Sequence, residues 1–358
     1  TPGTRAALAP AAAASSTKIT TRWTWANGTK LTATKVTPTA LPKSACTLKV
    51  KHSQGKGAMQ YGVLPNGVGL GLSRTGQLQQ FTKAGAKPYL KGRTPTEMYM
   101  ITTVGKTVYG TNAAAVLYRF DGPHAAPKRM TTLPLWGYDD LAITGGRVYF
   151  TRTVFLDGDK KMRQEVVSRP LTGGAIRVEA VGARSPRVTD VGILAVGVPA
   201  VISTADYSDQ EKLSGIVKLG GGKATPFLKF SRSTLAASVG EGPWNFAASG
   251  RTLTLPQAGT AGQLVVNLRT KRAWNIPSGK GSTPAPAGVS GSLAAWGEAR
   301  PPMDPITNKV YFFDVDRGTA RVLSTRIDFP LPLANGRAVT WQTWRADGTL
   351  DVTSIAVK

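Results

Sequence analysis

The segment ITTVGKTVYG at residues 101–110 places a turn glycine between two runs rich in β-branched and aromatic side chains. Glycine suits such a turn because a tight hairpin needs a positive φ, which glycine adopts at little steric cost. The segment therefore predicts a β-hairpin. The same arrangement recurs at residues 63–72, 142–151, 194–203, 247–256, 293–300 and 333–342.

The repeat predicts seven turn glycines, namely Gly67, Gly105, Gly146, Gly197, Gly250, Gly297 and Gly336. Their separations run from 38 residues (Gly67 to Gly105) to 53 residues (Gly197 to Gly250). A second pair of strands follows each hairpin, and four strands in ~40–45 residues are typical of one blade of a β-propeller. We expect insertions at residues 156–165 and 204–213 to account for the longer separations.

The last repeat lacks an outermost strand, and CTLKVKH at residues 46–52 is predicted to supply it. Such pairing removes exposed sheet edges, which otherwise promote aggregation. The predicted fold is therefore all-β, a seven-bladed β-propeller closed by an N-terminal strand and covering residues 46–358. Residues 1–18 are predicted to be a flexible Ala/Pro-rich tether, and residues 19–45 an N-terminal extension. A pair of β-sandwiches is the competing fold.

The repeat pattern of residues 46–358, with turns such as Asn66-Gly67 and Gly105-Lys106 before the second strand, resembles bacterial seven-bladed propellers. The similar domains are those called TolB-like, YncE-like and quinoprotein-like. The resemblance implies the fold and leaves the function open. WD40, kelch and sialidase motifs are absent.

The charge of the chain is strongly asymmetric. It has 45 Lys+Arg against 20 Asp+Glu, a net charge of +25, and the first acidic residue is Glu97. We expect the folded part of this acid-free stretch to form one basic sector between the first and seventh blades, which suggests an anionic partner.

Signatures of catalysis are scarce in the sequence. His52 and His124 are the two histidines, and Cys46 is the one cysteine, so neither a Ser-His dyad nor a transition-metal cluster is indicated. No run of eighteen apolar residues exists. The acidic residues within 157–159 and 206–211 leave calcium as the one cofactor open, against solvated acidic turns.

Alignment of the repeats suggests a site at the mouth of the central channel. Acidic residues recur just ahead of the first strand of several repeats, where they would either converge on one ligand or bond the backbone of their own turns. The candidate binding residues are Glu97, Asp139, Asp140, Asp190, Asp328, Arg93, Trp136, Tyr138, Arg187 and Trp244.

A second candidate site lies in the basic sector. Trp23 and Trp25 alternate beside Arg22 and would either stack on sugars or nucleic-acid bases or pack against the propeller side. Lys49 and Lys51, on the closing strand, complete this candidate set. No nucleic-acid-binding motif supports a nucleic-acid ligand, although the sequence does not exclude one.

The leading hypothesis is a secreted or cell-envelope-associated bacterial propeller that binds an anionic polymer or a partner protein. The tether-like start, the near absence of cysteine and the missing catalytic motifs favour this compartment and role; an internal piece of a longer protein would also explain the start. The alternative is a carbohydrate-active enzyme that uses carboxylates at the channel mouth. An assembly scaffold is a third hypothesis. We expect a monomer.

Overall fold

The structure, a computed structural model, describes most of the chain. The described residues are 17–42, 46–54, 59–73, 75–82, 84–90, 98–134, 141–204, 215–230, 246–257, 261–299, 306–328, 332–346 and 350–358. The regular elements formed by this part of the chain are all β-strands, which confirms the predicted all-β class.

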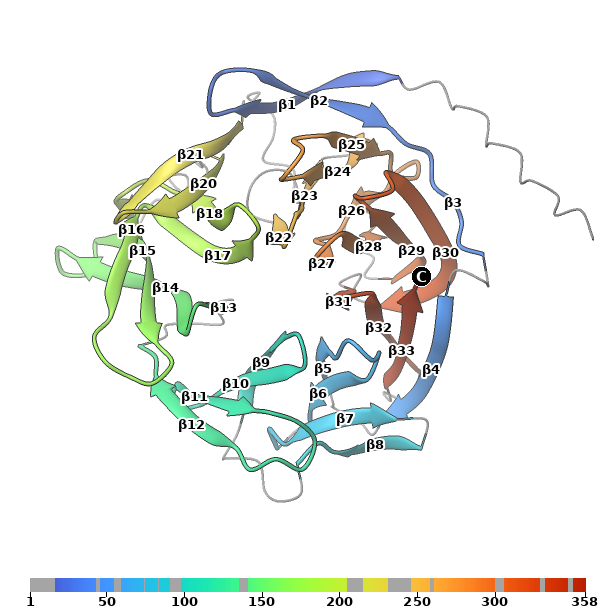
Figure 1. Ribbon diagram of the computed structural model, residues 1–358, viewed down its shortest axis with the longest axis horizontal. Coiled ribbons are helices and arrows are strands. Elements are labelled where there is room, and N and C mark those ends of the chain that lie inside the picture. The colour runs from blue at the N-terminus through green and yellow to red at the C-terminus, as the bar shows by residue number, and fades with distance from the viewer. Residues whose placement is uncertain are drawn as a thin grey trace, which may run out of the picture.

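Antiparallel four-stranded meanders are arranged around a central axis (Figure 1). The first contains β5 (Met59–Val63), β6 (Gly69–Leu72), β7 (Leu78–Thr82) and β8 (Gly85–Pro88). The next contains β9 (Met98–Val104), β10 (Thr107–Asn112), β11 (Val116–Phe120) and β12 (Lys128–Thr132). It is followed by β13 (Ala142–Thr144), β14 (Arg147–Leu156), β15 (Lys161–Pro170) and β16 (Arg177–Val181), with β19 (Ile202–Ser203) beside β15.

The second half of the ring repeats this arrangement. One meander contains β17 (Ala183–Thr189), β18 (Gly192–Gly197), β20 (Gly215–Gly220) and β21 (Lys223–Phe230). The next contains β22 (Ala247–Ser249), β23 (Thr252–Gln257), β24 (Gly262–Asn267) and β25 (Ala273–Ile276). It is followed by β27 (Gly288–Ser290), β28 (Leu293–Ala299), β29 (Ile306–Asp314) and β30 (Thr319–Asp328), with β26 (Thr283–Pro284) beside β28. The last contains β31 (Leu333–Asn335), β32 (Ala338–Trp344), β33 (Leu350–Val357) and β4 (Cys46–Gln54).

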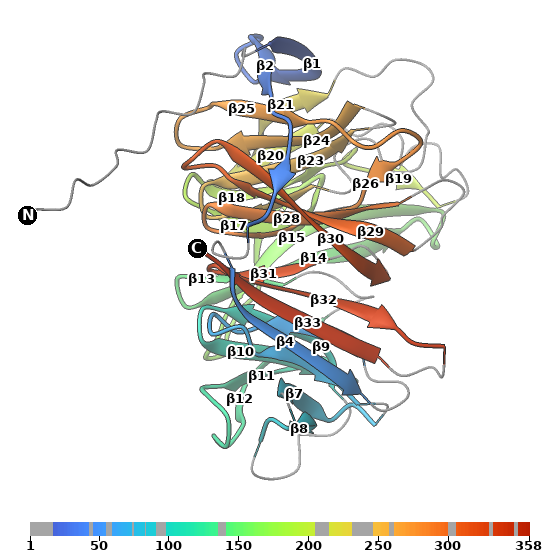
Figure 2. The same cartoon turned by 90° about the vertical axis from the view of Figure 1, so that its right-hand side faces the viewer.

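The N-terminal strands run along the outside of the ring. β1 (Lys18–Trp25) and β2 (Lys30–Lys35) form a hairpin in which β1 pairs antiparallel with β21 and β2 pairs parallel with β25. β3 (Thr39–Ala40) then pairs with β30, and β4 pairs antiparallel with β33 (Figure 2). The N-terminal strands β1–β4 thus pair with the outer edges of several meanders. The expectation that the acid-free stretch forms one basic sector between the first and last meanders is therefore wrong.

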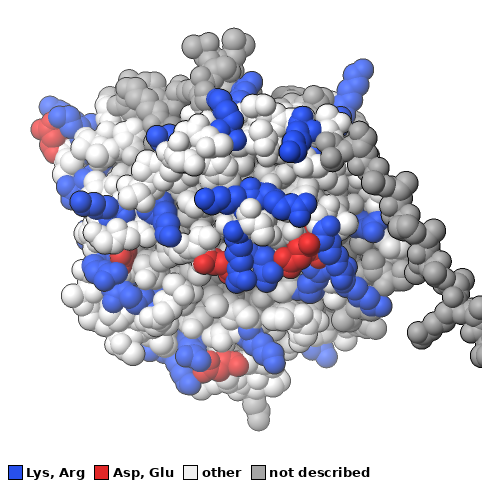
Figure 3. Space-filling model, turned by 45° about the horizontal axis from the view of Figure 1, so that its top comes forward, with Lys and Arg blue, Asp and Glu red and all other residues white. Residues whose placement is uncertain are grey.

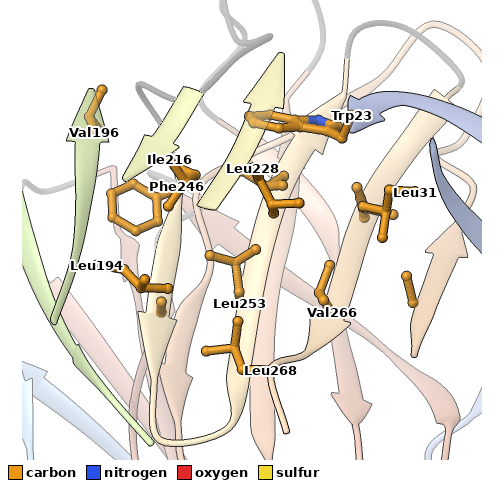
Figure 4. Close-up of a cluster of buried hydrophobic side chains, with 14 of the residues drawn as sticks. Trp23, Leu31, Leu194, Val196, Ile216, Leu228, Phe246, Leu253, Val266 and Leu268 are labelled. Atoms are coloured by element: carbon orange, nitrogen blue, oxygen red, sulfur yellow. The ribbon is translucent and has the colours of Figure 1, made fainter. Parts of the chain in front are cut away.

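Hydrophobic clusters lie between neighbouring meanders and hold the ring together. Figure 4 shows the cluster between β17–β21 and β22–β25, to which the hairpin contributes Trp23 and Leu31. Both side chains are 1% exposed. Trp296 and Trp341 are also 1% exposed and belong to the clusters on either side of β28. The hairpin is thus part of the core.

The predicted turn glycines are correct at five positions. Gly67, Gly105, Gly146, Gly250 and Gly336 all have a positive φ at the turn between the first two strands of their meander.

Gly197 and Gly297 were assigned wrongly as turn glycines, because Gly197 ends β18 and Gly297 lies within β28. In both meanders the first hairpin forms one strand earlier, with turns after Thr189 and Ser290. Each stretch contains another glycine, Gly192 or Gly291, that permits the alternative register.

The predicted insertion at residues 156–165 is not a loop. β14 and β15 are both lengthened and stay paired from Arg147–Pro170 to Leu156–Lys161, so the extra residues extend one hairpin. The other predicted insertion, at 204–213, lies outside the described residues except for Thr204.

Candidate functional site

A cavity of about 320 Å³ lies on the axis, lined by β9, β13, β17, β22, β27 and β31. These strands are the innermost of their meanders, so alternate side chains on them point to the axis. The polar side chains that line it are Thr102, Thr103, Arg187, Thr189, Asp190, Ser249, Ser290 and Asn335. The wall therefore carries hydroxyl groups together with one guanidinium and one carboxylate, which suits a polar ligand.

Arg187 and Asp190 are the two predicted channel residues that the structure brings together in this cavity. The Arg187 guanidinium lies 5.7 Å from the ring centre of Phe246, and its Nη1 donates to the Pro186 carbonyl at 3.2 Å. Asp190 Oδ2 is 2.6 Å from Arg269 Nε. This carboxylate is therefore held in an ion pair.

The position of Asp190 differs from the prediction. It follows the innermost strand β17, within the first hairpin turn, and does not precede that strand. The Asp190 backbone N–H donates to the Gly250 carbonyl at 2.7 Å, which ties this turn to the turn of the next meander. The mistaken turn at Gly197 caused the misplacement.

Asp328 does not line the cavity, and its placement in the channel-mouth set is corrected. It ends β30, an outer strand, and is 3% exposed. Its carboxylate accepts hydrogen bonds from Arg326 Nε at 3.1 Å and from the Trp344 backbone N–H at 2.5 Å. Asp328 is therefore engaged by Arg326 and by the backbone of β32 in the last meander, and not by the backbone of its own turn.

The remaining channel-mouth candidates are not tested by the structure. Glu97, Asp139, Asp140, Arg93, Trp136, Tyr138 and Trp244 lie outside the described residues.

The structure assigns different roles to the two N-terminal tryptophans. Trp23 is buried against Phe230, with ring centres 4.9 Å apart, so of its two predicted roles the structure agrees with packing against the propeller side and not with stacking on a ligand. Trp25 is only half-buried, and its ring centre lies 5.7 Å from that of Phe227. Arg22 is exposed on β1. Lys49 and Lys51 lie on β4, where the backbone alone is described.

One face of the ring carries the turns between the first and second, and the third and fourth, strands of each meander. We call it the turn face. Because strands alternate in direction within a meander and innermost strands of neighbouring meanders run parallel, as at Thr189 and Gly250, these turns share one side. The basic residues in these turns are Lys106, Arg251, Arg269, Lys271, Arg272, Arg317 and Arg337.

Carboxylates on the turn face are already paired. Among the described residues in and beside these turns, the acids are Asp121, Asp190, Asp314 and Asp316, and each forms an ion pair with arginine or lysine. Figure 3 shows Lys and Arg spread over this face and the neighbouring hairpin, with few Asp or Glu between them. The turn face therefore presents a surplus of positive charge to solvent.

Sequence reasoning did not single out the basic residues of the β24–β25 turn. The segment LRTKRAW at 268–274 carries three basic residues in four positions, which was the available signal. Their importance depends on the neighbouring hairpin, which lies at least 234 residues earlier in the sequence (Lys35 to Arg269).

Metal binding has limited support in the described part of the chain, which holds no cluster of three or more His, Cys, Asp or Glu suited to an ion. Asp157 and Asp159 occupy the β14–β15 turn with positive φ, and Asp157 Oδ2 is 3.6 Å from Lys161 Nζ. The acidic residues of 206–211 lie outside the described residues, so calcium binding stays a prediction. No helix in the described segments is long and apolar enough to cross a membrane.

No protein-family model and no curated protein sequence matches this chain. Solved structures do share its fold. An oligogalacturonate lyase from Vibrio parahaemolyticus is 12% identical, with a TM-score of 0.52 over 96% of this chain and 99% of its own. A manganese complex of oligogalacturonate lyase is 12% identical, with a TM-score of 0.51 over 97% of this chain and 99% of its own. The structure of YCF48 bound to D1 peptide is 9% identical in sequence, with a TM-score of 0.52 over 90% of this chain and 98% of its own.

These likenesses and the meanders around one axis define the protein as a β-propeller. The class agrees with the bacterial propellers that the repeat pattern resembles. At identities near 10%, the likeness extends to the fold alone.

Proposed function

We propose that this chain is an extracytoplasmic binding propeller that engages an anionic polymer or an acidic partner protein at the cell envelope. The observation that carries the proposal is the turn face, where the described carboxylates are all in ion pairs and basic side chains remain in excess. Such a surface concentrates polyanions, and its attraction weakens as salt screens the charges.

The proposed architecture is a seven-bladed propeller in which β4 supplies the outer strand of the last blade and closes the ring. Residues 46–358 form the propeller, residues 19–45 an extension on its outer side, and residues 1–18 a tether. The β4–β33 pairing supports closure, since it joins the two ends of the ring by antiparallel hydrogen bonds.

A fold of this kind serves both binding and catalysis, since YCF48 holds a peptide and the lyases are named for a reaction on oligogalacturonate. The enzyme alternative needs carboxylates that are free to act. Of the candidate carboxylates in the described part of the chain, Asp190 and Asp328 are both engaged by arginines, which favours the binding hypothesis.

The test is a binding titration of the purified chain with fluorescein-labelled dextran sulfate, with neutral dextran as the matched control. We expect binding of the sulfated polymer to fall at least about tenfold between about 50 and about 500 mM NaCl, because the Debye length shrinks. An affinity that does not change with salt concentration, or equal binding of neutral dextran, contradicts the proposal. Fractionation of the source cells with an antibody tests the compartment, and recovery in the cytoplasm alone would refute it.

A further inference from the structure

The β24–β25 turn holds three basic residues in a fixed geometry. Asn267 Oδ1 accepts hydrogen bonds from the backbone N–H groups of Arg269 at 3.0 Å and Thr270 at 3.1 Å, and the Asn267 N–H donates to the Arg272 carbonyl at 2.8 Å. The turn is therefore closed by its own hydrogen bonds. The backbone that carries its cations is therefore ordered before any ligand binds, which lowers the entropy lost on binding.

Lys271 adopts a backbone conformation that lysine rarely takes. Its φ is +57°, in the left-handed region favoured by Gly, Asn and Asp. A non-glycine residue held there is strained, and such strain concentrates at functional sites. The turn accepts this strain and presents a cation at its tip.

The N-terminal hairpin completes the cluster. β2 pairs parallel with β25, with Thr34 opposite Trp274 and Lys35 opposite Asn275, so Lys35 lies beside β25, three residues beyond the turn that ends at Arg272. We call Lys35, Arg269, Lys271 and Arg272 the basic seam. Each of these four side chains is exposed.

Aromatic rings support two of the seam cations. Lys271 Nζ lies 5.6 Å from the centre of the Trp25 ring, and the Arg272 guanidinium lies 5.3 Å from that of Trp274. These contacts orient the cations and leave their charge intact. Half-buried Trp25 also adds an aromatic surface of the kind on which sugar rings pack.

The seam carries more positive charge than the protein neutralises. Arg269 pairs with Asp190, whereas Lys35, Lys271 and Arg272 form no ion pair with a described carboxylate. Four cations and one acid give a local charge of +3. Because Asp190 also lines the axial cavity, the seam runs from the cavity towards the outer hairpin.

We propose that the basic seam binds an acidic polysaccharide, a linear sugar chain with a carboxylate on each repeat. The arginines match carboxylate geometry, the lysines supply charge, and Trp25 offers a surface for a sugar ring. A linear chain fits a line of cations that starts at a hydroxyl-lined cavity. This inference rests on the proposed function and specifies its ligand and its site.

The experiment measures binding of fluorescein-labelled alginate to the full chain and to the variants Lys35→Gln and Lys271→Gly, at about 50 mM NaCl. Lys160→Gln is the matched control, because Lys160 is exposed in the β14–β15 turn, which joins a second and a third strand and so lies away from the turn face. We expect each seam variant to lose about tenfold in affinity and the control to lose less than about twofold. Lys271→Gly should bind more weakly without melting at a lower temperature, because glycine removes the strain at φ +57°.

The possible outcomes separate the seam from the broader function. Equal alginate binding by the native chain and both seam variants overturns the seam and leaves the proposed function intact. Failure of the native chain to bind alginate or dextran sulfate overturns both. Tighter binding of poly-L-glutamate than of alginate overturns the polysaccharide assignment, and a lower melting temperature in both seam variants would trace their weaker binding to the fold.

Discussion

Replacing Trp23 with alanine tests whether the N-terminal hairpin is an integral part of the propeller. Trp23 is 1% exposed and packs between the β17–β21 and β22–β25 meanders. An aromatic side chain buries roughly 150–250 Å², which at about 25 cal/mol per Å² corresponds to about 4–6 kcal/mol. Residual burial in the unfolded chain lowers this by roughly 10–40%. We therefore expect Trp23→Ala to lower the free energy of unfolding by about 3–5 kcal/mol.

Urea denaturation followed by far-UV circular dichroism measures this loss without relying on tryptophan fluorescence. The control is Trp25→Ala, two residues away on the same strand but half-buried, for which we expect a loss of about 1–2 kcal/mol. A loss below about 1 kcal/mol for Trp23→Ala, or equal losses for both variants, would refute the reasoning. The hairpin would then lie on the propeller without stabilising it.

Three further substitutions test the ring and its cores. Asn335→Ala should cost about 2–3 kcal/mol in urea unfolding, because its Nδ2 donates to two carbonyls of neighbouring meanders at 3.0 and 2.8 Å. Gly288→Ala should cost about 1–3 kcal/mol, since a Cβ there would lie 2.2 Å from a backbone oxygen; Gly122→Ala, with open space around it, should melt like the native chain. Burial, followed by the Glu298 carboxylate, raises the pKa of Tyr311 above its ordinary value. Its contribution to stability is therefore present below about pH 10 and lost as pH rises beyond that. Tyr311→Phe should flatten the alkaline fall in melting temperature, and an unchanged pH profile would contradict this.

Local chemistry made much of the fold predictable. A positive φ is a property of a single residue, so Gly67, Gly105 and Gly146 identify their hairpins without knowledge of the rest of the chain. The same signal was ambiguous where two glycines compete. Gly192 and Gly197 each permit a turn, and only packing of the resulting strands selects the register.

The candidate site was predicted less completely, because its parts are distant in sequence. Arg187 and Asp190 were chosen from the repeat alignment and its surroundings, and both line the axial cavity, Asp190 from the turn after β17. The partner of Asp190 is Arg269, which no local pattern connects to it. The seam at Lys271 likewise depends on a tryptophan from the N-terminal hairpin.

The sequence by itself determined the all-β class, the repeated hairpins, the strand at residues 46–52 and the excess of positive charge. These features follow from side-chain alternation, turn geometry and composition, which act over a few residues. Only the tertiary structure decided where the charge lies. The hairpin pairs with β21 and β25 because their outer edges offer unpaired backbone groups and an apolar surface for Trp23 and Leu31. Such complementarity between distant segments exists only once the strands are in place.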